Sequence, residues 1–378
     1  IPLMIGTAGG CGARPHVELT VNIIREIARE QHLHFKMAVI DAEFEKDFIK
    51  AELRKGNVTP LGPAPELTEE SVDECIHIVG QMGEEPYIKA LEMGVQVILA
   101  GRSYDPCEFS ALAISKGFPK ALAIHMGKIL ECAAITALPG SGSDCMLGTL
   151  RKDSFVVEPL NPERKCTTLS VAAHSLYEKS NPYELPGPGG AIDLHKTTFT
   201  QLSESQVEVR GTEFVPTEDY YIKLEGVRRV GYRTISPAAT HDPVMISQID
   251  EVIRGVRNRV EDNFNMKDSR NTWLDFKVYG KKGVMHMFPE TPESSSDELL
   301  IIIEAVAPTQ EEANTLCSFA RSTMLHYGYE GRISTAGNLA FPFSPSDCRM
   351  GEVFEFNVYH LLRVADPCEP FPIHLLEL

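Results

Sequence analysis

The chain has 378 residues, of which 43% are hydrophobic and 24% charged, and its formal net charge is -17. This composition is typical of a folded globular protein, and the length favours two domains over one. The negative charge argues against a nucleic-acid partner and against binding to an anionic membrane surface. Apolar runs are short and interrupted, as where Glu304 follows Leu299–Ile303, so they predict strands rather than membrane-spanning helices.

Two features bear on the compartment and on the start of the chain. The nine cysteines are odd in number and form no CxxC pair, which argues against a disulfide framework and a structural zinc site. We therefore expect reduced thiols and a cytoplasmic location. The chain opens on the apolar segment Ile1–Gly6 without an initiator Met or a signal sequence, so we expect a buried strand there and a natural amino-terminal segment ahead of it.

The first third of the chain alternates between strand-like and helix-like patterns. Short apolar runs bounded by turn residues predict the strands, and apolar residues at helical spacing predict the helices between them. This order predicts an α/β domain over residues 1–139, built on a mostly parallel, doubly wound sheet. The predicted strands are 1–6, 36–40, 77–80 and 95–100, and the predicted helices are 17–28, 45–55, 86–93 and one starting at 105.

The pattern changes after residue 139. Alternating β-branched and aromatic residues between turn signals predict several antiparallel strands, followed by two strand–helix units. We expect an α+β second domain over residues 140–378. The predicted strands are 155–157, 197–202, 206–209, 220–224, 273–279, 299–306 and 353–360, and the predicted helices are 244–264 and 309–327.

The segment Gly101–Pro106 is the first candidate site, because it directly follows the predicted buried strand 95–100. Ligands of open α/β sheets bind beyond the carboxyl ends of such strands. Arg102, with Ser103 beside it, can hold a carboxylate or phosphate, and Asp105 can act as a base or a metal ligand. Two alternatives are structural: an internal Arg102–Asp105 ion pair, and Asp105 as the N-cap of the next helix.

A glycine-rich loop follows the first predicted strand and precedes a helix. Backbone N–H groups in this position can bind an anion, so Gly9, Gly10 and Gly12 are candidate substrate contacts, with Arg14 as a nearby cation. The alternative is an ordinary tight turn. The loop has neither the P-loop spacing nor a GxGxxG pattern, so the chain carries no nucleotide fingerprint.

A second candidate site lies on the predicted helix around His125. Lys128, Glu131 and Cys132 follow at spacings that place all four side chains on one helical face. A polar stripe on a packed helix needs partners or a cavity, so His125 and Glu131 are candidate catalytic groups. The alternatives are a solvated face for the charged residues and an apolar packing role for Cys132.

Two further turns, in the second predicted domain, can bring backbone close to a ligand. They contribute Gly189, Gly190, Gly337 and Asn338 as candidate binding residues of an interdomain cleft, although both can also be ordinary turns. The sequence contains no HExxH, GxSxG or EF-hand pattern. A divalent metal ion held by separated Asp, Glu and His side chains stays open as a cofactor.

Seven blocks of the chain stand out together: Gly6–Gly10, Glu85–Gly94, Ala100–Asp105, His125–Ala133, Ser170–His174, Pro188–Asp193 and Thr335–Phe341. In this combination the chain resembles the AtuA-like family of acyclic terpene utilisation proteins, and the resemblance covers nearly the whole chain. It implies a place in a catabolic pathway but supplies no defined reaction. Its members usually carry further residues before the first strand, in line with the expected missing segment.

The residues favour an enzyme that moves a proton or water on a small carboxylic acid or its acyl-CoA thioester. Arg102 would hold the carboxylate, and Asp105, His125 or Glu131 would exchange the proton, which makes a lyase, hydratase or isomerase a better fit than an oxidoreductase. Two other classes remain: a metal-dependent hydrolase, and a non-catalytic subunit that binds a metabolite or a partner protein. We also expect a homo-oligomer, because symmetric pairing closes exposed sheet edges.

Overall fold

A computed structural model describes residues 1–177, 181–264, 266, 271–281, 283–284 and 296–378. It divides into two compact units, residues 1–227 with 356–378 and residues 228–355. Two long strands, β13 (Tyr220–Thr240) and β16 (Cys348–Val364), contribute residues to both units. The expected domain division after residue 139 falls within the first unit and stays a prediction.

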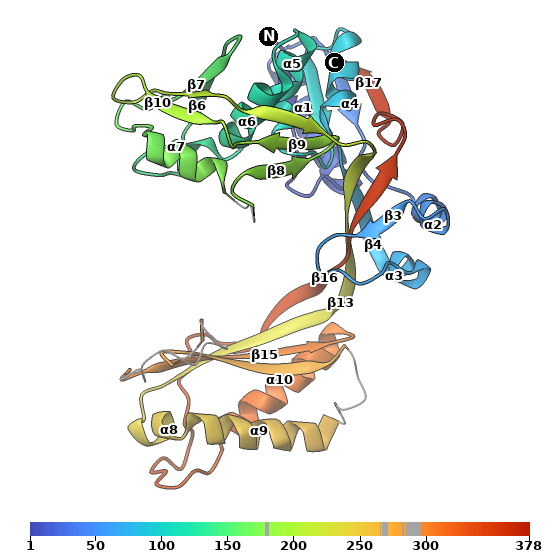
Figure 1. Cartoon of the computed structure of the whole chain (residues 1–378). Coiled ribbons are helices and arrows are strands. Elements are labelled where there is room, and N and C mark those ends of the chain that lie inside the picture. The colour runs from blue at the N-terminus through green and yellow to red at the C-terminus, as the bar shows by residue number, and fades with distance from the viewer. Residues whose placement is uncertain (178–180, 265, 267–270, 282, 285–295) are drawn as a thin grey trace. The chain divides into compact units, whose positions relative to one another are not determined.

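The first unit contains a four-stranded, mostly parallel sheet (Figure 1). Its three parallel strands are in register, with Leu3 opposite Val97 and Ala38 opposite Ile98, and the fourth strand is antiparallel to its neighbour. The predicted α/β class is therefore confirmed. The strand order is β1 (Leu3–Ile5), β5 (Val97–Ala100), β2 (Lys36–Ile40) and β17 (Ile373–Glu377).

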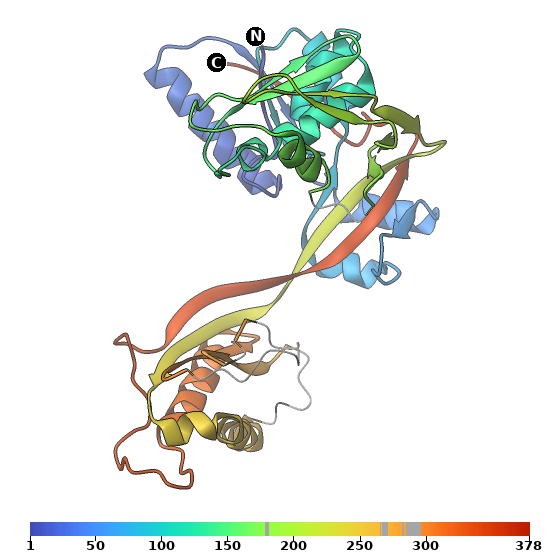
Figure 2. The ribbon, with the colours of Figure 1, turned by 60° about the vertical axis from the view of Figure 1, so that its left-hand side comes forward.

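Helices cover both faces of this sheet. Successive residues of β2 point to opposite sides, so they pack against different helices. Met37 and Val39 pack with Val17 of α1 on one face, whereas Ala38 belongs to the cluster that contains Tyr87 of α4 on the other. Figure 2 shows α1 on one side of the sheet and the helices of the other face opposite it. The helices concerned are α1 (Arg14–Glu30), α4 (Glu84–Glu92) and α5 (Cys107–Ser115).

Two strand predictions in this region are wrong in their details. The first strand is not buried: β1 lies at the edge of the sheet with one neighbour, and Leu3 is 56% exposed. The predicted strand at 77–80 forms as β4 (Cys75–Gln81) but pairs with β13 outside the parallel sheet. The apolar run predicted a strand correctly, because this pattern marks a buried strand whichever strand it pairs with.

The rest of the first unit consists of short helices and antiparallel sheets. The helices are α2 (Lys46–Arg54), α3 (Glu69–Glu74), α6 (Lys120–Leu130), a 3-10 turn at Ala133–Ile135 and α7 (Thr168–Ser175). One sheet has the order β10 (Thr198–Gln201), β11 (Val207–Arg210), β7 (Ser154–Pro159) and β6 (Met146–Leu150). A second has the order β12 (Glu213–Pro216), β9 (Gly190–Asp193) and β8 (Glu184–Gly187), and β3 (Val58–Pro60) pairs with β16.

The second unit has the βαββαβ order of ferredoxin-like folds, with its strands in the order β14-β15-β13-β16. Its helices pack on one face of the sheet, where Val252 and Val256 join Ile301 and Ile303 in one core. The predicted helix 244–264 is interrupted at Gln248, so it forms two helices. The remaining elements are α8 (Pro243–Ser247), α9 (Ile249–Phe264), β14 (Trp273–Tyr279), β15 (Leu299–Ala307) and α10 (Gln310–Leu325).

Gly12 provides a test of how tightly the loops of the first unit pack. Its φ is +69°, and an added Cβ would lie 2.1 Å from the backbone nitrogen of Arg102. We expect Gly12→Ala to lower the free energy of unfolding by about 3 kcal/mol or more, because strain and a backbone clash add together. Gly94→Ala is the matched control, since Gly94 also has a positive φ, of +74°, but open space around it. Urea denaturation of both variants measures the difference, and equal losses would contradict the tight contact.

Candidate functional site

Three loops of the first unit meet beyond the carboxyl end of β5. The backbone N–H of Met82, just after β4, donates to the carbonyl of Arg102 at 3.1 Å, and the N–H of Tyr104 donates to the carbonyl of Met82 at 2.8 Å. Gly12, from the loop after β1, lies against the backbone of Arg102. These backbone contacts therefore position Arg102 independently of its side-chain hydrogen bonds.

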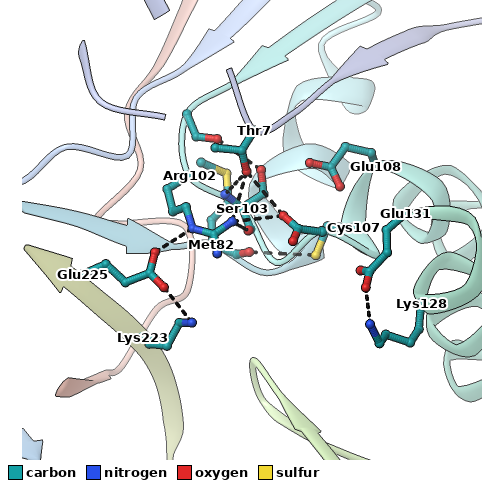
Figure 3. Close-up of polar contacts among 12 residues, drawn as sticks. Thr7, Met82, Arg102, Ser103, Cys107, Glu108, Lys128, Glu131, Lys223 and Glu225 are labelled. Atoms are coloured by element: carbon teal, nitrogen blue, oxygen red, sulfur yellow. Dashed lines mark hydrogen bonds and ion pairs between the residues drawn. The ribbon is translucent and has the colours of Figure 1, made fainter. Parts of the chain in front are cut away.

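The guanidinium of Arg102 joins several of these segments (Figure 3). Nε donates to Glu225 Oε2 at 2.7 Å, and Nη1 donates to Asp105 Oδ1 at 3.0 Å and to Thr7 Oγ1 at 3.2 Å. Nη1 also donates to the carbonyl of Ser103 at 2.8 Å. In the described part of the chain, Nη2 makes no hydrogen bond, so one edge of the guanidinium is left for a ligand.

Glu225 of β13 carries the charge that compensates Arg102. Its other oxygen, Oε1, lies 2.6 Å from Lys223 Nζ. Burial opposes the charged carboxylate, but the hydrogen bonds and positive charges of Arg102 and Lys223 outweigh it and lower the pKa of Glu225. Glu225 is therefore a fixed anion and is not available as a proton donor near neutral pH.

A second hydrogen-bonded chain runs behind Arg102. The hydroxyl of Tyr87 lies 2.8 Å from Ser103 Oγ and donates to Glu108 Oε1 at 3.0 Å. Tyr87 and Ser103 are fully buried, and Glu108 is partly exposed. Burial raises the pKa of Glu108 from 4.5 to about 7, and the charge of Asp105 adds to the rise.

Asp105 occupies a different environment from Glu108, although only two residues separate them. Its side chain is 50% exposed and forms an ion pair with Arg102. The predicted N-cap role is wrong, because the N-cap of α5 is Pro106 and no side chain caps that helix. The carboxylate instead binds Arg102 and accepts a hydrogen bond from Thr7 at 3.4 Å. The two carboxyl groups therefore differ in environment: Asp105 is exposed and paired with Arg102, whereas burial raises the pKa of Glu108 to about 7.

A cavity of about 250 Å³ adjoins this network through Lys223. Its lining includes Gly189 and Gly190, both predicted as binding residues, and also Gln81, the residue before Met82. Gly189 has a φ of +71° and lies under the ring of Tyr220, where an added Cβ would be 2.7 Å from a ring carbon. The backbone of the turn between β8 and β9 therefore lies close to this cavity, and the cationic side chain of Lys223 forms part of the cavity wall.

The other candidate residues in and beside the glycine-rich loop, Gly9, Gly10 and Arg14, have different neighbours. Arg14 pairs with Asp41 at 3.5 Å and with Glu45 at 3.2 Å, and its backbone N–H donates to a carboxylate. Gly9 lies against the side chain of His16, and Gly10 has open space around it. The structure therefore brings Gly12 to the Arg102 network, whereas Arg14 is engaged by acidic side chains.

The candidate residues on α6 and at its C-cap, Glu131, divide into a neutral histidine and an ion pair. His125 is fully buried, with Nδ1 2.8 Å from Thr212 Oγ1 and Nε2 2.8 Å from Ser175 Oγ. Burial lowers the pKa of His125 to about 3, and both ring nitrogens are engaged, so we assign it no proton transfer. Glu131 forms an ion pair with Lys128, and both are largely buried. Figure 3 shows this pair across Cys107 from Arg102.

Gly337 and Asn338 belong to the second unit. The side chain of Asn338 donates to the carbonyl of Tyr327 at 2.9 Å, and its backbone N–H donates to the carbonyl of Leu325 at 3.0 Å. Asn338 therefore satisfies carbonyls at the carboxyl end of α10, which is a structural role.

Sequence reasoning missed Thr7, Tyr87, Glu108 and Glu225. One signal was available for Glu225, because Lys223 and Glu225 alternate with the buried Leu224 on a predicted strand and so share a polar face. Glu108 lies in the first turn of the helix that Asp105 precedes, close enough to have been considered with it. Nothing local marks Tyr87, whose partner is 16 residues away.

A comparison with protein families gives a match over most of the chain. The family model described as acyclic terpene utilisation family protein AtuA matches residues 8–137 and 153–340. Neither the curated proteins nor the solved structures contain a match. In the described residues, no helix is long and apolar enough to cross a membrane, and no group of three or more His, Cys, Asp or Glu residues is arranged to hold a metal ion.

The raised pKa of Glu108 predicts a pH dependence of stability. The folded carboxyl keeps its proton up to about pH 7, whereas an unfolded one loses it near pH 4.5. Its contribution is therefore fully present below pH 4.5 and is lost as the pH rises through 7, by up to about 3 kcal/mol. The difference in free energy of unfolding between Glu108→Gln and the wild type should therefore shift in favour of the variant when the pH is raised from 5 to 8. Urea denaturation at both values measures this, with the exposed Glu30→Gln as control, and parallel curves for all three proteins would refute it.

Proposed function

The chain belongs to the acyclic terpene utilisation family AtuA, whose name places it in acyclic terpene catabolism, and we propose that it is a lyase or hydratase of that catabolism. Its substrate would be a small carboxylic acid or the acyl-CoA thioester of one. Asp105 would act as the base and Glu108 as the acid. A cytoplasmic location and a homo-oligomer belong to the same proposal.

One observation carries the proposal: two carboxyl groups, three positions apart, lie in contrasting environments that suit a base and an acid. Asp105 is exposed and paired with Arg102, and burial raises the pKa of Glu108 to about 7. Elimination of water needs such a pair. Asp105 would take a proton from the carbon next to the carbonyl, the electrons would form the double bond as the C–O bond breaks, and Glu108 would give its proton to the departing hydroxyl.

Arg102 would bind the carboxylate or the thioester oxygen through Nη2. Glu225 accepts a hydrogen bond from Nε and so orients the guanidinium. Glu225 also pairs with Lys223, which lies in the wall of the 250 Å³ cavity. A cavity of this size suits a short acyl group. It also contains Gly189 and Gly190, whose backbone can approach the ligand closely.

The proposed reaction predicts hydrogen exchange that does not depend on knowing the final product. Short saturated, unsaturated and 3-hydroxy acids and their CoA thioesters, incubated with the protein in D2O, should gain deuterium next to the carbonyl. We expect Asp105→Asn to reduce this exchange on the order of 10²–10⁴-fold and Glu108→Gln to reduce water elimination by a similar factor. Mass spectrometry of the recovered acids measures both.

The control for these variants is Glu30→Gln, a neutralised carboxylate on the exposed face of α1. If Asp105→Asn keeps near-normal exchange in a folded protein, the assignment of the base is wrong. If ligands bind to the wild type but none exchanges, the protein is a metabolite-binding subunit instead. A metal-dependent hydrolase would instead release product only after a divalent ion is added, and chelation would stop it.

Arg102→Lys tests the binding role separately. Lysine keeps the charge but loses the planar fork, so we expect ligand affinity to fall about tenfold or more while the exchange rate at saturation changes less. Calorimetric titration together with thermal denaturation measures affinity and stability side by side. If affinity falls only in proportion to the loss of folded protein, Arg102 has a structural role alone.

A further inference from the structure

The loop that follows β1 contains a cysteine beside a histidine. Cys11 is exposed, and its Sγ lies 3.1 Å from Nδ1 of His16 in the first turn of α1. Gly9 fixes the histidine: its φ is +60°, and an added Cβ would lie 2.6 Å from the Cβ of His16. The imidazole therefore rests against backbone that only glycine can provide, with one nitrogen directed at the thiol.

This arrangement has the two parts of an activated nucleophile, a thiol and a base within hydrogen-bond distance. With Nδ1 as acceptor, the imidazole can take the thiol proton and leave a thiolate. The loop also precedes the amino-terminal end of α1, a helix of 17 residues whose partial positive charge stabilises an anion there. Cys145 is exposed too, but its thiol makes no hydrogen bond in the described part of the chain.

The loop also connects the thiol to the candidate site. Gly12, the residue after Cys11, lies against the backbone of Arg102, and Thr7 of the same loop accepts a hydrogen bond from the Arg102 guanidinium. Cys11 thus stands on the loop that borders Arg102, to which the proposed function assigns the anionic group of the substrate. An acyl thioester combines the two matching features, an electrophilic carbonyl carbon and, in its coenzyme portion, negative charge.

We propose that Cys11 is an acyl-acceptor site, a function beyond the elimination chemistry assigned to Asp105 and Glu108. The Cys11 thiolate attacks the carbonyl carbon of an acyl thioester, the bond from that carbon to the original sulfur breaks, and the leaving thiolate takes the proton held by His16. The products are a Cys11 thioester and a free thiol, with no change in oxidation state. His16 is the base, and Gly9 positions it.

The test compares two cysteines within the same wild-type chain. At pH 7, iodoacetamide should alkylate Cys11 about tenfold faster than Cys145, because thiolate rather than thiol is the reactive form. Acetyl-CoA and hexanoyl-CoA should each place one acyl group on Cys11 and release one free CoA per chain. Peptide mass spectrometry after acid quenching locates the adducts, and a thiol assay counts the CoA.

Two pairs of variants, each with a matched control, separate the base from the thiol. His16→Asn should reduce the alkylation rate of Cys11 to that of Cys145, whereas His34→Asn, a change at an exposed histidine, should leave it unaltered. Cys11→Ser should abolish acylation, and Cys145→Ser should retain it. Thermal denaturation shows that each variant is folded.

Equal alkylation of Cys11 and Cys145 in the wild type, or an undiminished rate in His16→Asn, would overturn the dyad. Fast alkylation without acylation by either thioester would overturn the acyl-acceptor function. Acylation is scored without reference to deuterium exchange, so this proposal and the proposed lyase activity can each fail alone.

Discussion

The structure around the candidate site depends on neutralising one largely buried positive charge. Arg102 has a side chain that is 15% exposed, and a buried guanidinium without partners would be strongly destabilising. Its partners come from the loop after β1, from the turn before α5 and from β13, so these segments must converge for the charge to be tolerated. The same convergence places Asp105 at the surface and Glu108 behind it.

Local patterns were sufficient for many of the elements, but not for short strands such as β3, β6 and β17 or for the pairing of strands. The strands β2 and β14 have the predicted bounds because apolar runs between turn residues mark them directly. The pairing of β4 with β13 and the closing strand β17 depend on segments far apart in the chain. The site divides in the same way. Arg102 and Asp105 could be named as candidates from their position after a buried strand, whereas Glu225, 123 residues from Arg102, joins them only through folding.

Three histidines illustrate why residue type alone did not identify the chemistry. His125 was the stronger candidate from its helical spacing, yet two hydroxyl groups engage both of its nitrogens in a fully buried position. His174 is also buried and stacks on Tyr177, as expected for a core histidine. His16 differs from both, because its Nδ1 lies 3.1 Å from the thiol of the exposed Cys11. Solvent access and the identity of the second partner, neither of which the sequence pattern contains, decide which histidine can react.

The glycines of the candidate loops serve mainly to position side chains. Gly9 supports the imidazole of His16, Gly12 admits the backbone of Arg102, and Gly189 accommodates the ring of Tyr220. Each has a positive φ together with a neighbour that a Cβ would displace, so both the conformation and the space require glycine. Gly10 differs, because nothing lies within 4 Å of its added Cβ. The contacts of the glycine-rich loop are thus those of a support for the Arg102 backbone and the His16 side chain, and its predicted role in binding an anion stays a prediction.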